Sequence, residues 1–116
     1  MGRMFDYNLT AGTKTIAASD TFTTGALDIS QGENYAVNVV AVSGTAPDFS
    51  ISYTASTESD GTYITPDSPT IAANVGAAKS VGFTPVLSKF IKITFTNNNA
   101  SNSVIVTAKL TVQEGC

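Results

Sequence analysis

The side chains that could carry out acid–base chemistry in this chain are carboxylates, because it contains no histidine and a single cysteine. A glycosidase needs two carboxylates that face each other in a cleft and lie about 5–10 Å apart. Glu58 and Asp60 are close in sequence, but they flank a predicted turn where solvent screens them. We therefore expect no catalytic site and no enzyme activity. The nine carboxylates are Asp6, Asp20, Asp28, Glu33, Asp48, Glu58, Asp60, Asp67 and Glu114.

Metal binding is the next chemistry that these residue types could support. Asp28, Asp48, Asp60 and Asp67, together with loop carbonyls, could form an oxygen cage for calcium. No Asp-x-Asp-x-Asp-Gly loop is present, however, so we expect neither a metal nor a cofactor. Cys116 cannot form an internal disulfide, because the chain has no second cysteine. As the last residue it is expected to be an exposed tail or an engineered handle, and the alternative is an intermolecular disulfide.

The charges argue against nucleic acid and membrane partners. The net charge is −3, and the six basic residues are scattered singly without a basic run. Binding to phosphate backbones would need clustered lysines or arginines. Residues 1–6 lack the apolar segment of a signal peptide, and the longest apolar runs are far shorter than the roughly 20 residues that span a bilayer.

The strongest structural signal is the strict alternation of apolar and hydroxyl side chains over residues 49–54. This period of two predicts a strand with one buried and one solvated face. Asp60-Gly61 is expected to supply the positive φ of a hairpin turn that leads into a second strand at 62–65. The inward residues of the first strand are predicted to be Phe49, Ile51 and Tyr53.

Similar alternation predicts strands along most of the chain. Residues 35–42 are apolar on both faces, which predicts a central strand covered on both sides. Residues 31–34 are expected to form a loop, and the prolines in 66–69 to stop strand pairing. Residues 70–78 could form a helical turn, but Gly76 and the nearby prolines favour a loop with one short strand. The other clear strands are predicted at 4–9, 79–84, 89–96 and 103–112.

These patterns predict an all-β protein. The chain has 116 residues, of which 42% are hydrophobic and 13% are charged, as expected for one domain with a core. Eight to nine strands with regular turn signals indicate an antiparallel β-sandwich of jelly-roll or Greek-key type. We assign residues 13–112 to the sandwich, 1–12 to an N-terminal arm or edge strand, and 113–116 to a C-terminal tail.

An asparagine-rich segment, residues 97–102, is predicted to be a solvated hairpin loop between the last two strands. Its amides could contact a partner, or they could simply face water. The four tyrosines (Tyr7, Tyr35, Tyr53 and Tyr63) fit interior strand positions better than an exposed sugar-binding platform. The candidate partner-contact residues are Asn97, Asn98, Asn99 and Asn102.

The order of these motifs over residues 35–112 resembles the small β-sandwich head-decoration and accessory proteins of tailed bacteriophage virions. The motifs that carry the resemblance are the turn at 42–48, the Ser-Asp-Gly hairpin at 59–63, the Lys-flanked strand at 89–95 and the Val-rich strand at 104–112. The resemblance implies a structural virion protein, assembled in the host cytoplasm, that binds and stabilises a phage capsid protein, often as a homotrimer. The alternative is a carbohydrate- or receptor-binding sandwich, for example from a phage tail.

Overall fold

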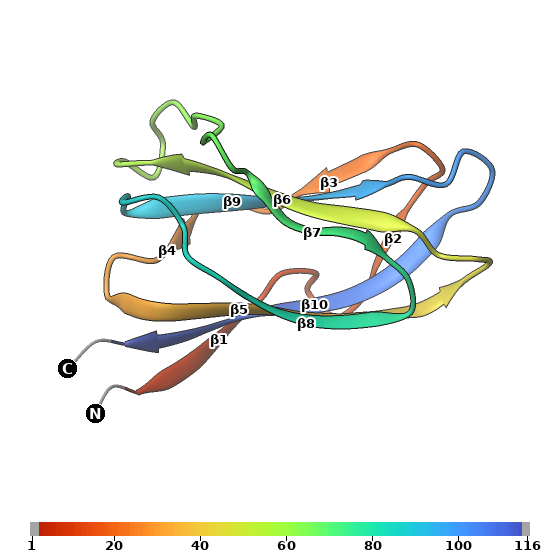
Figure 1. The fold of residues 1–116 in the computed structure, drawn as a ribbon, viewed down its shortest axis with the longest axis horizontal. Coiled ribbons are helices and arrows are strands. Elements are labelled where there is room, and N and C mark those ends of the chain that lie inside the picture. Colours follow the sequence, from red (N-terminus) through yellow and green to blue (C-terminus); the bar gives the residue numbers. More distant parts are fainter. Residues whose placement is uncertain (1–2, 115–116) are drawn as a thin grey trace.

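The computed structural model describes residues 3–114, and these form ten strands and no helix. The strands build two antiparallel sheets that pack face to face as a sandwich (Figure 1). The predicted β-sandwich is therefore confirmed. The strands are β1 (Met4–Asn8), β2 (Lys14–Ile16), β3 (Thr21–Thr23), β4 (Leu27–Asp28), β5 (Gly32–Gly44), β6 (Phe49–Ser56), β7 (Thr70–Val75), β8 (Ala78–Phe83), β9 (Phe90–Asn97) and β10 (Val104–Glu114).

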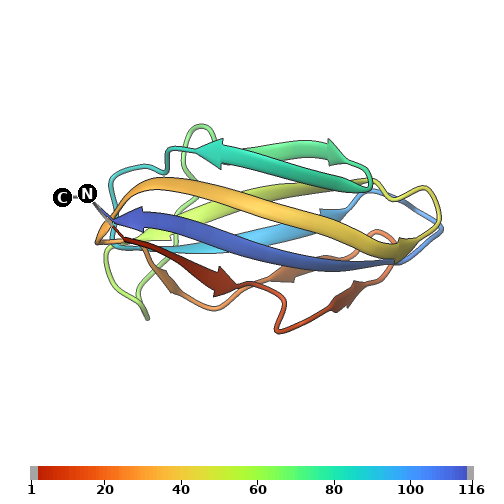
Figure 2. The ribbon, with the colours of Figure 1, turned by 90° about the horizontal axis from the view of Figure 1, so that it is seen from below.

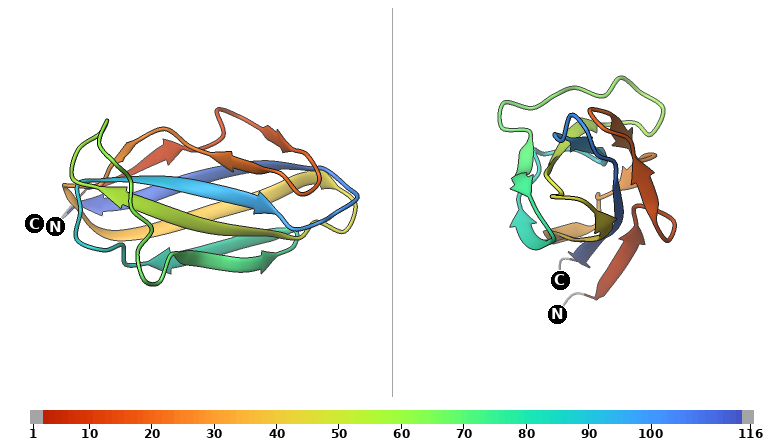
Figure 3. Two further views of the ribbon diagram at one scale, coloured as in Figure 1. Left: turned by 90° about the horizontal axis from the view of Figure 1, so that it is seen from above. Right: turned by 90° about the vertical axis from the view of Figure 1, so that its right-hand side faces the viewer.

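The chain passes repeatedly from one sheet to the other. Sheet A has the order β1-β10-β5-β8, with β2 also paired to β10, and it faces the viewer in Figure 2. Sheet B has the order β3-β9-β6-β7, with β4 also paired to β9, and it faces the viewer in the left panel of Figure 3. From β7 onward each connection crosses between the sheets, so the wiring is not a plain meander. The described residues form ten strands, one or two more than the eight to nine predicted.

The core lies between the sheets and follows the predicted alternation. In β6, β9 and β10, buried residues alternate with half-buried ones along nearly the whole strand. Phe49 and Phe95 are fully buried, and Phe95 stacks on Phe22 with ring centroids 6.2 Å apart. This alternation places the hydroxyl residues of β6 and β9 on the outer face of sheet B.

The prediction that residues 35–42 are covered on both faces is wrong. In β5, Val37 and Val39 are buried in the core, but Val40 and Val42 are 45% and 51% exposed. The strand is central in sheet A, between β10 and β8, yet nothing among the described residues covers the outer face of that sheet. The apolar outer row of β5 is therefore a surface feature.

Within the segment 31–34, which is predicted as a loop, residues 32–34 are part of a strand, and the short strand predicted within 70–78 is β7. Residues 32–34 extend β5, because β10 continues to Glu114 and pairs with them through Gln113 and Glu114. Residues 70–75 form β7, which pairs with β6 through two irregularities in register. In both cases pairing with a distant strand overrides a locally polar or alanine-rich sequence.

The predicted hairpin at 48–65 forms only in part. Its second arm makes a single bridge, in which Ala55 and Ile64 exchange two backbone hydrogen bonds of 2.9 and 3.0 Å. Pairing then stops, because the prolines that follow cannot donate to a ladder. Gly61 does not adopt a positive φ, contrary to our prediction. A Cβ at this position would lie 2.9 Å from the Ser56 hydroxyl oxygen, so crowding is the reason that glycine fits here.

At the N-terminal end, β1 pairs along its length with β10 and forms an edge of sheet A. The Arg3 guanidinium and the Glu114 carboxylate make an exposed ion pair of 2.9 Å beside this strand. Because β10 reaches Glu114, residues 113 and 114 belong to the sheet. The prediction for Cys116 lies outside the described residues.

Candidate interaction surfaces

The carboxylates are dispersed over the structure. Among residues 3–114 no three carboxylate, histidine or cysteine side chains lie close enough together to hold a metal ion, so the four aspartates of the possible calcium cage are not gathered. Several act as local hydrogen-bond acceptors instead. Asp28 accepts from both the hydroxyl and the backbone N–H of Ser30, and these two bonds lower the pKa of Asp28. Asp20 similarly accepts from the backbone N–H of Thr21.

The asparagine-rich segment lies at the end of the sandwich formed by the β5–β6 and β9–β10 connections. Asn98 donates to the Ser50 hydroxyl at 2.9 Å, and Asn99 accepts from the backbone N–H groups of Ser101 and Asn102. Asn98 is exposed, whereas Asn99 and Asn102 are half-buried. A role for these three in partner contact stays a prediction.

Asn97 does not belong to that exposed surface, and its assignment to a solvated loop is wrong. It ends β9 and is buried, with 1% of its surface exposed. Its amide nitrogen lies within 3.0–3.2 Å of the carbonyl oxygens of Ile16, Ala17 and Asn102. Its side-chain oxygen accepts from the backbone N–H of Asn99. Asn97 therefore ties three chain segments together and has a structural role.

The tyrosines brace loops from the margin of the core. Tyr53 is buried in β6, while Tyr7 and Tyr35 are half-buried in sheet A. Tyr63 lies outside the strands, contrary to the prediction, and the Lys92 ammonium sits 4.4 Å from its ring centroid. Tyr63 also donates to the carbonyl of Ser59. These contacts leave no tyrosine as a free, flat stacking platform among the described residues.

Because of Tyr7 and Tyr35, we expect the folded protein to lose stability at alkaline pH. Their hydroxyls donate to the carbonyl oxygens of Asp28 and Ile29, each at 2.7 Å. Burial, and secondarily the Asp28 carboxylate, raises the pKa of both phenols above 10.0. The folded state therefore keeps these protons longer than the unfolded state, so this stability is complete below pH 10 and is lost as the pH rises through the raised values.

We expect Tyr7→Phe to lower the free energy of unfolding at pH 7 by about 1 kcal/mol. It should also flatten the alkaline decline, because one of the shifted groups is removed. Urea unfolding at several values between pH 7 and pH 11 measures both effects. An unchanged alkaline slope in this variant would show that Tyr7 does not contribute to it.

The outer face of sheet A carries a row of hydrogen-bonded polar side chains. The Thr111 hydroxyl donates to Asp6 at 2.7 Å, the Asn38 amide donates to Thr111 at 3.3 Å, and the Ser80 hydroxyl donates to Asn38. The row crosses β1, β10, β5 and β8 in order. The exposed Val40 lies next to it in two shallow depressions of the same face. This face is broad and has few charges.

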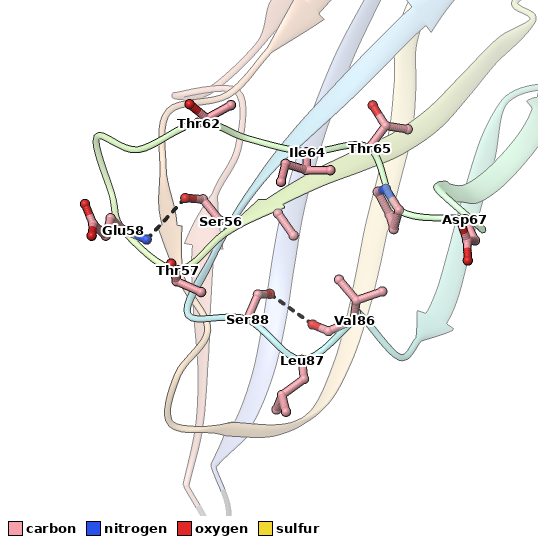
Figure 4. A pocket seen from close by; sticks show the side chains of 12 residues that line it. Ser56, Thr57, Glu58, Thr62, Ile64, Thr65, Asp67, Val86, Leu87 and Ser88 are labelled. Carbon is pink, nitrogen blue, oxygen red and sulfur yellow. Dashed lines mark hydrogen bonds between the residues drawn. The ribbon is translucent and has the colours of Figure 1, made fainter.

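A pocket of about 650 Å³ opens at the opposite end of the sandwich from the asparagine-rich segment. Its walls come from the β6–β7 connection, which carries Ile64, and the β8–β9 connection, which carries Val86 and Leu87 (Figure 4). Leu87 is fully exposed, and Ile64 is 68% exposed. Glu58 and Asp67 lie at opposite ends of the lining (Figure 4). This pocket was not predicted from the sequence. The one sequence feature that indicates it is the apolar pair Val86-Leu87, which directly follows Pro85 between two predicted strands.

No family model and no curated protein matches this chain. Among solved structures, the SPBc2 prophage-derived protein YomS superposes with a TM-score of 0.59 at 12% identity, over 98% of this chain and 96% of that one. The fold is shared. The PBSX exported protein XepA gives 0.60 at 16% identity, over 97% of this chain and 38% of that one. The VP2 subviral particle of infectious bursal disease virus superposes with a TM-score of 0.61 at 13% identity, over 97% of this chain and 32% of that one.

These likenesses concern the fold alone, because the identities are low. This chain corresponds to nearly all of YomS but to little more than a third of XepA and about a third of VP2. Two of these neighbours carry viral names, the prophage-derived YomS and the subviral particle of infectious bursal disease virus, and what they share with this chain is the fold. Within residues 3–114, no helix is long and apolar enough to cross a membrane.

Proposed function

We propose that this protein is a non-enzymatic structural protein of a virus particle. In its specific form, the proposal is that the chain binds a phage capsid protein from outside and stabilises the shell as a decoration subunit, assembling as a homotrimer. The fold shared with YomS, XepA and VP2 supports the broad role. Asp20 and Asp28 accept hydrogen bonds from neighbouring residues, which is a structural use of these carboxylates.

The observation that carries the proposal is the outer face of sheet A. Val40 and Val42 are exposed there beside a row of fixed polar side chains. Asp6 and Lys109 are the charged side chains beside Val40 in one of the two depressions, so few ions are desolvated on binding, and the hydrogen-bonding groups of the row are already ordered. The molecule measures 44 × 30 × 23 Å, so its broad face can supply the roughly 800 Å² per partner of a specific interface.

The test is co-sedimentation of the purified protein with empty shells of the same virus. We expect the wild-type protein to pellet with shells and to raise the temperature at which they break. Val42→Glu should lower the affinity about tenfold or more, because it buries a charge without a partner. Thr94→Glu on the outer face of sheet B is the matched control and should bind normally. Equal binding by both variants would exclude the outer face of sheet A as the contact.

The second candidate is a carbohydrate- or receptor-binding module. The end pocket favours it, since hydroxyls and two carboxylates surround its apolar floor. No aromatic side chain lines this pocket within the described residues, which weakens the case for stacking on a sugar ring. A glycan array separates the candidates, because specific glycan binding without shell binding would support the second and exclude the first.

A further inference from the structure

An exposed leucine, Leu87, lies at the rim of the end pocket. Leu87 is fully exposed and points away from the other lining side chains (Figure 4). An apolar side chain held in water is a frequent sign of an interaction site when other apolar groups surround it. Here Ile64 and Val86 are also exposed, at 68% and 44%. This end therefore combines a projection with a hollow.

The connection that carries Leu87 is fixed by hydrogen bonds on both sides. The backbone N–H of Val86 donates to the Tyr53 hydroxyl at 3.0 Å, and the Ser88 hydroxyl donates to the carbonyl of Val86 at 2.9 Å. The backbone N–H of Lys89 donates to the carbonyl of Ser56 at 3.2 Å, which attaches the connection to β6. Leu87 is presented in this orientation by the fold, so little conformational entropy remains to be lost on binding.

The charges at this end are of opposite sign but are not paired. Glu58 and Asp67 line the pocket, whereas Lys89 is exposed just beyond it. Among the described residues the only ion pair joins Arg3 to Glu114, so these three charges form no ion pair within one molecule. A partner that fits the pocket needs an apolar side chain followed closely by a cation. The segment Leu87-Ser88-Lys89 of this same chain has that pattern.

We propose that the end pocket binds a second copy of this chain. Leu87 of one molecule occupies the hollow between Ile64 and Val86 of its neighbour, and Lys89 approaches the neighbour's Glu58 or Asp67. A one-way contact, in which Leu87 of each molecule enters the pocket of the next, is heterologous, and such contacts form closed rings when the rotation closes. This interface rests on the proposed function, since a decoration subunit at a symmetry point needs a face for its own copies.

The experiment is light scattering during gel filtration, followed by sedimentation at several protein concentrations, on the wild-type protein under reducing conditions. We expect a mass that is a small multiple of the 12.0 kDa chain, with three copies favoured. Leu87→Ser should weaken self-association about tenfold or more, because a leucine is no longer buried. Val42→Ser, which also removes an exposed apolar side chain, is the matched control and should leave the mass unchanged.

Charge exchange tests the pairing directly. Lys89→Glu should weaken self-association, and adding Glu58→Lys and Asp67→Lys to it should restore the wild-type mass. A wild-type protein that is monomeric at every concentration overturns the proposal, as does equal behaviour of Leu87→Ser and Val42→Ser. Glycan binding by a monomeric protein through this pocket overturns it as well. Shell binding by a monomer would overturn this interface and the homotrimeric form of the proposed function, while leaving capsid binding intact.

Discussion

Phe95→Ala should lower the free energy of unfolding by about 3–5 kcal/mol, the largest effect that we expect from a single substitution in this chain. Phe95 is completely buried in β9, opposite Ile51 of β6, and it stacks on Phe22 of β3. Removing the ring loses its transfer from water and leaves a cavity between the sheets that rigid strands cannot close. Because small domains are stable by only about 5–15 kcal/mol, the variant should be close to unfolding.

Urea unfolding followed by circular dichroism and tyrosine fluorescence measures this effect. Phe95→Leu keeps most of the volume and should be less destabilising than the alanine variant. Ile64→Ala, which removes an exposed aliphatic side chain, should change the stability by less than about 0.5 kcal/mol. If Phe95→Ala cost no more than Ile64→Ala, the sheets would not pack around Phe95 as described.

Asn97→Ala should cost on the order of 3 kcal/mol, although it replaces a polar residue in a polar segment. The amide of Asn97 satisfies carbonyls of Ile16, Ala17 and Asn102 in a region with almost no access to water. Truncation leaves these carbonyls without their donor, and a buried polar group without a partner costs about 1–3 kcal/mol. The β2–β3 and β9–β10 connections should then loosen together.

Chemical denaturation and amide hydrogen exchange test this second prediction. Exchange should speed up most around residues 17–20 and 98–102, which Asn97 joins. Asn98→Ala is the matched control at the neighbouring, exposed position, and it should cost no more than about 1 kcal/mol. A similar small effect from Asn97→Ala would mean that water replaces the amide, so that Asn97 is not a structural link.

Prediction from the sequence succeeded where one strand carries its own signal. The strands predicted at 89–96 and 103–112 are confirmed by β9 and β10. A side-chain period of two leaves only one choice of buried face, so the pattern was sufficient here. It was wrong for residues 35–42, whose two apolar faces looked alike. Burial of the outer face depends on whether another layer covers sheet A, and no property of β5 itself reports that.

Composition and local periodicity were enough to predict the fold class and most of the core residues. Only the tertiary structure decided the surfaces. It buried Asn97 by bringing β2 and the β9–β10 connection against it, and it exposed Val42 on an open face. It also placed Ile64 beside Leu87, although 23 positions separate them in the sequence. Such contacts between distant segments depend on strand order and sheet packing, which hydrophobic periodicity does not encode.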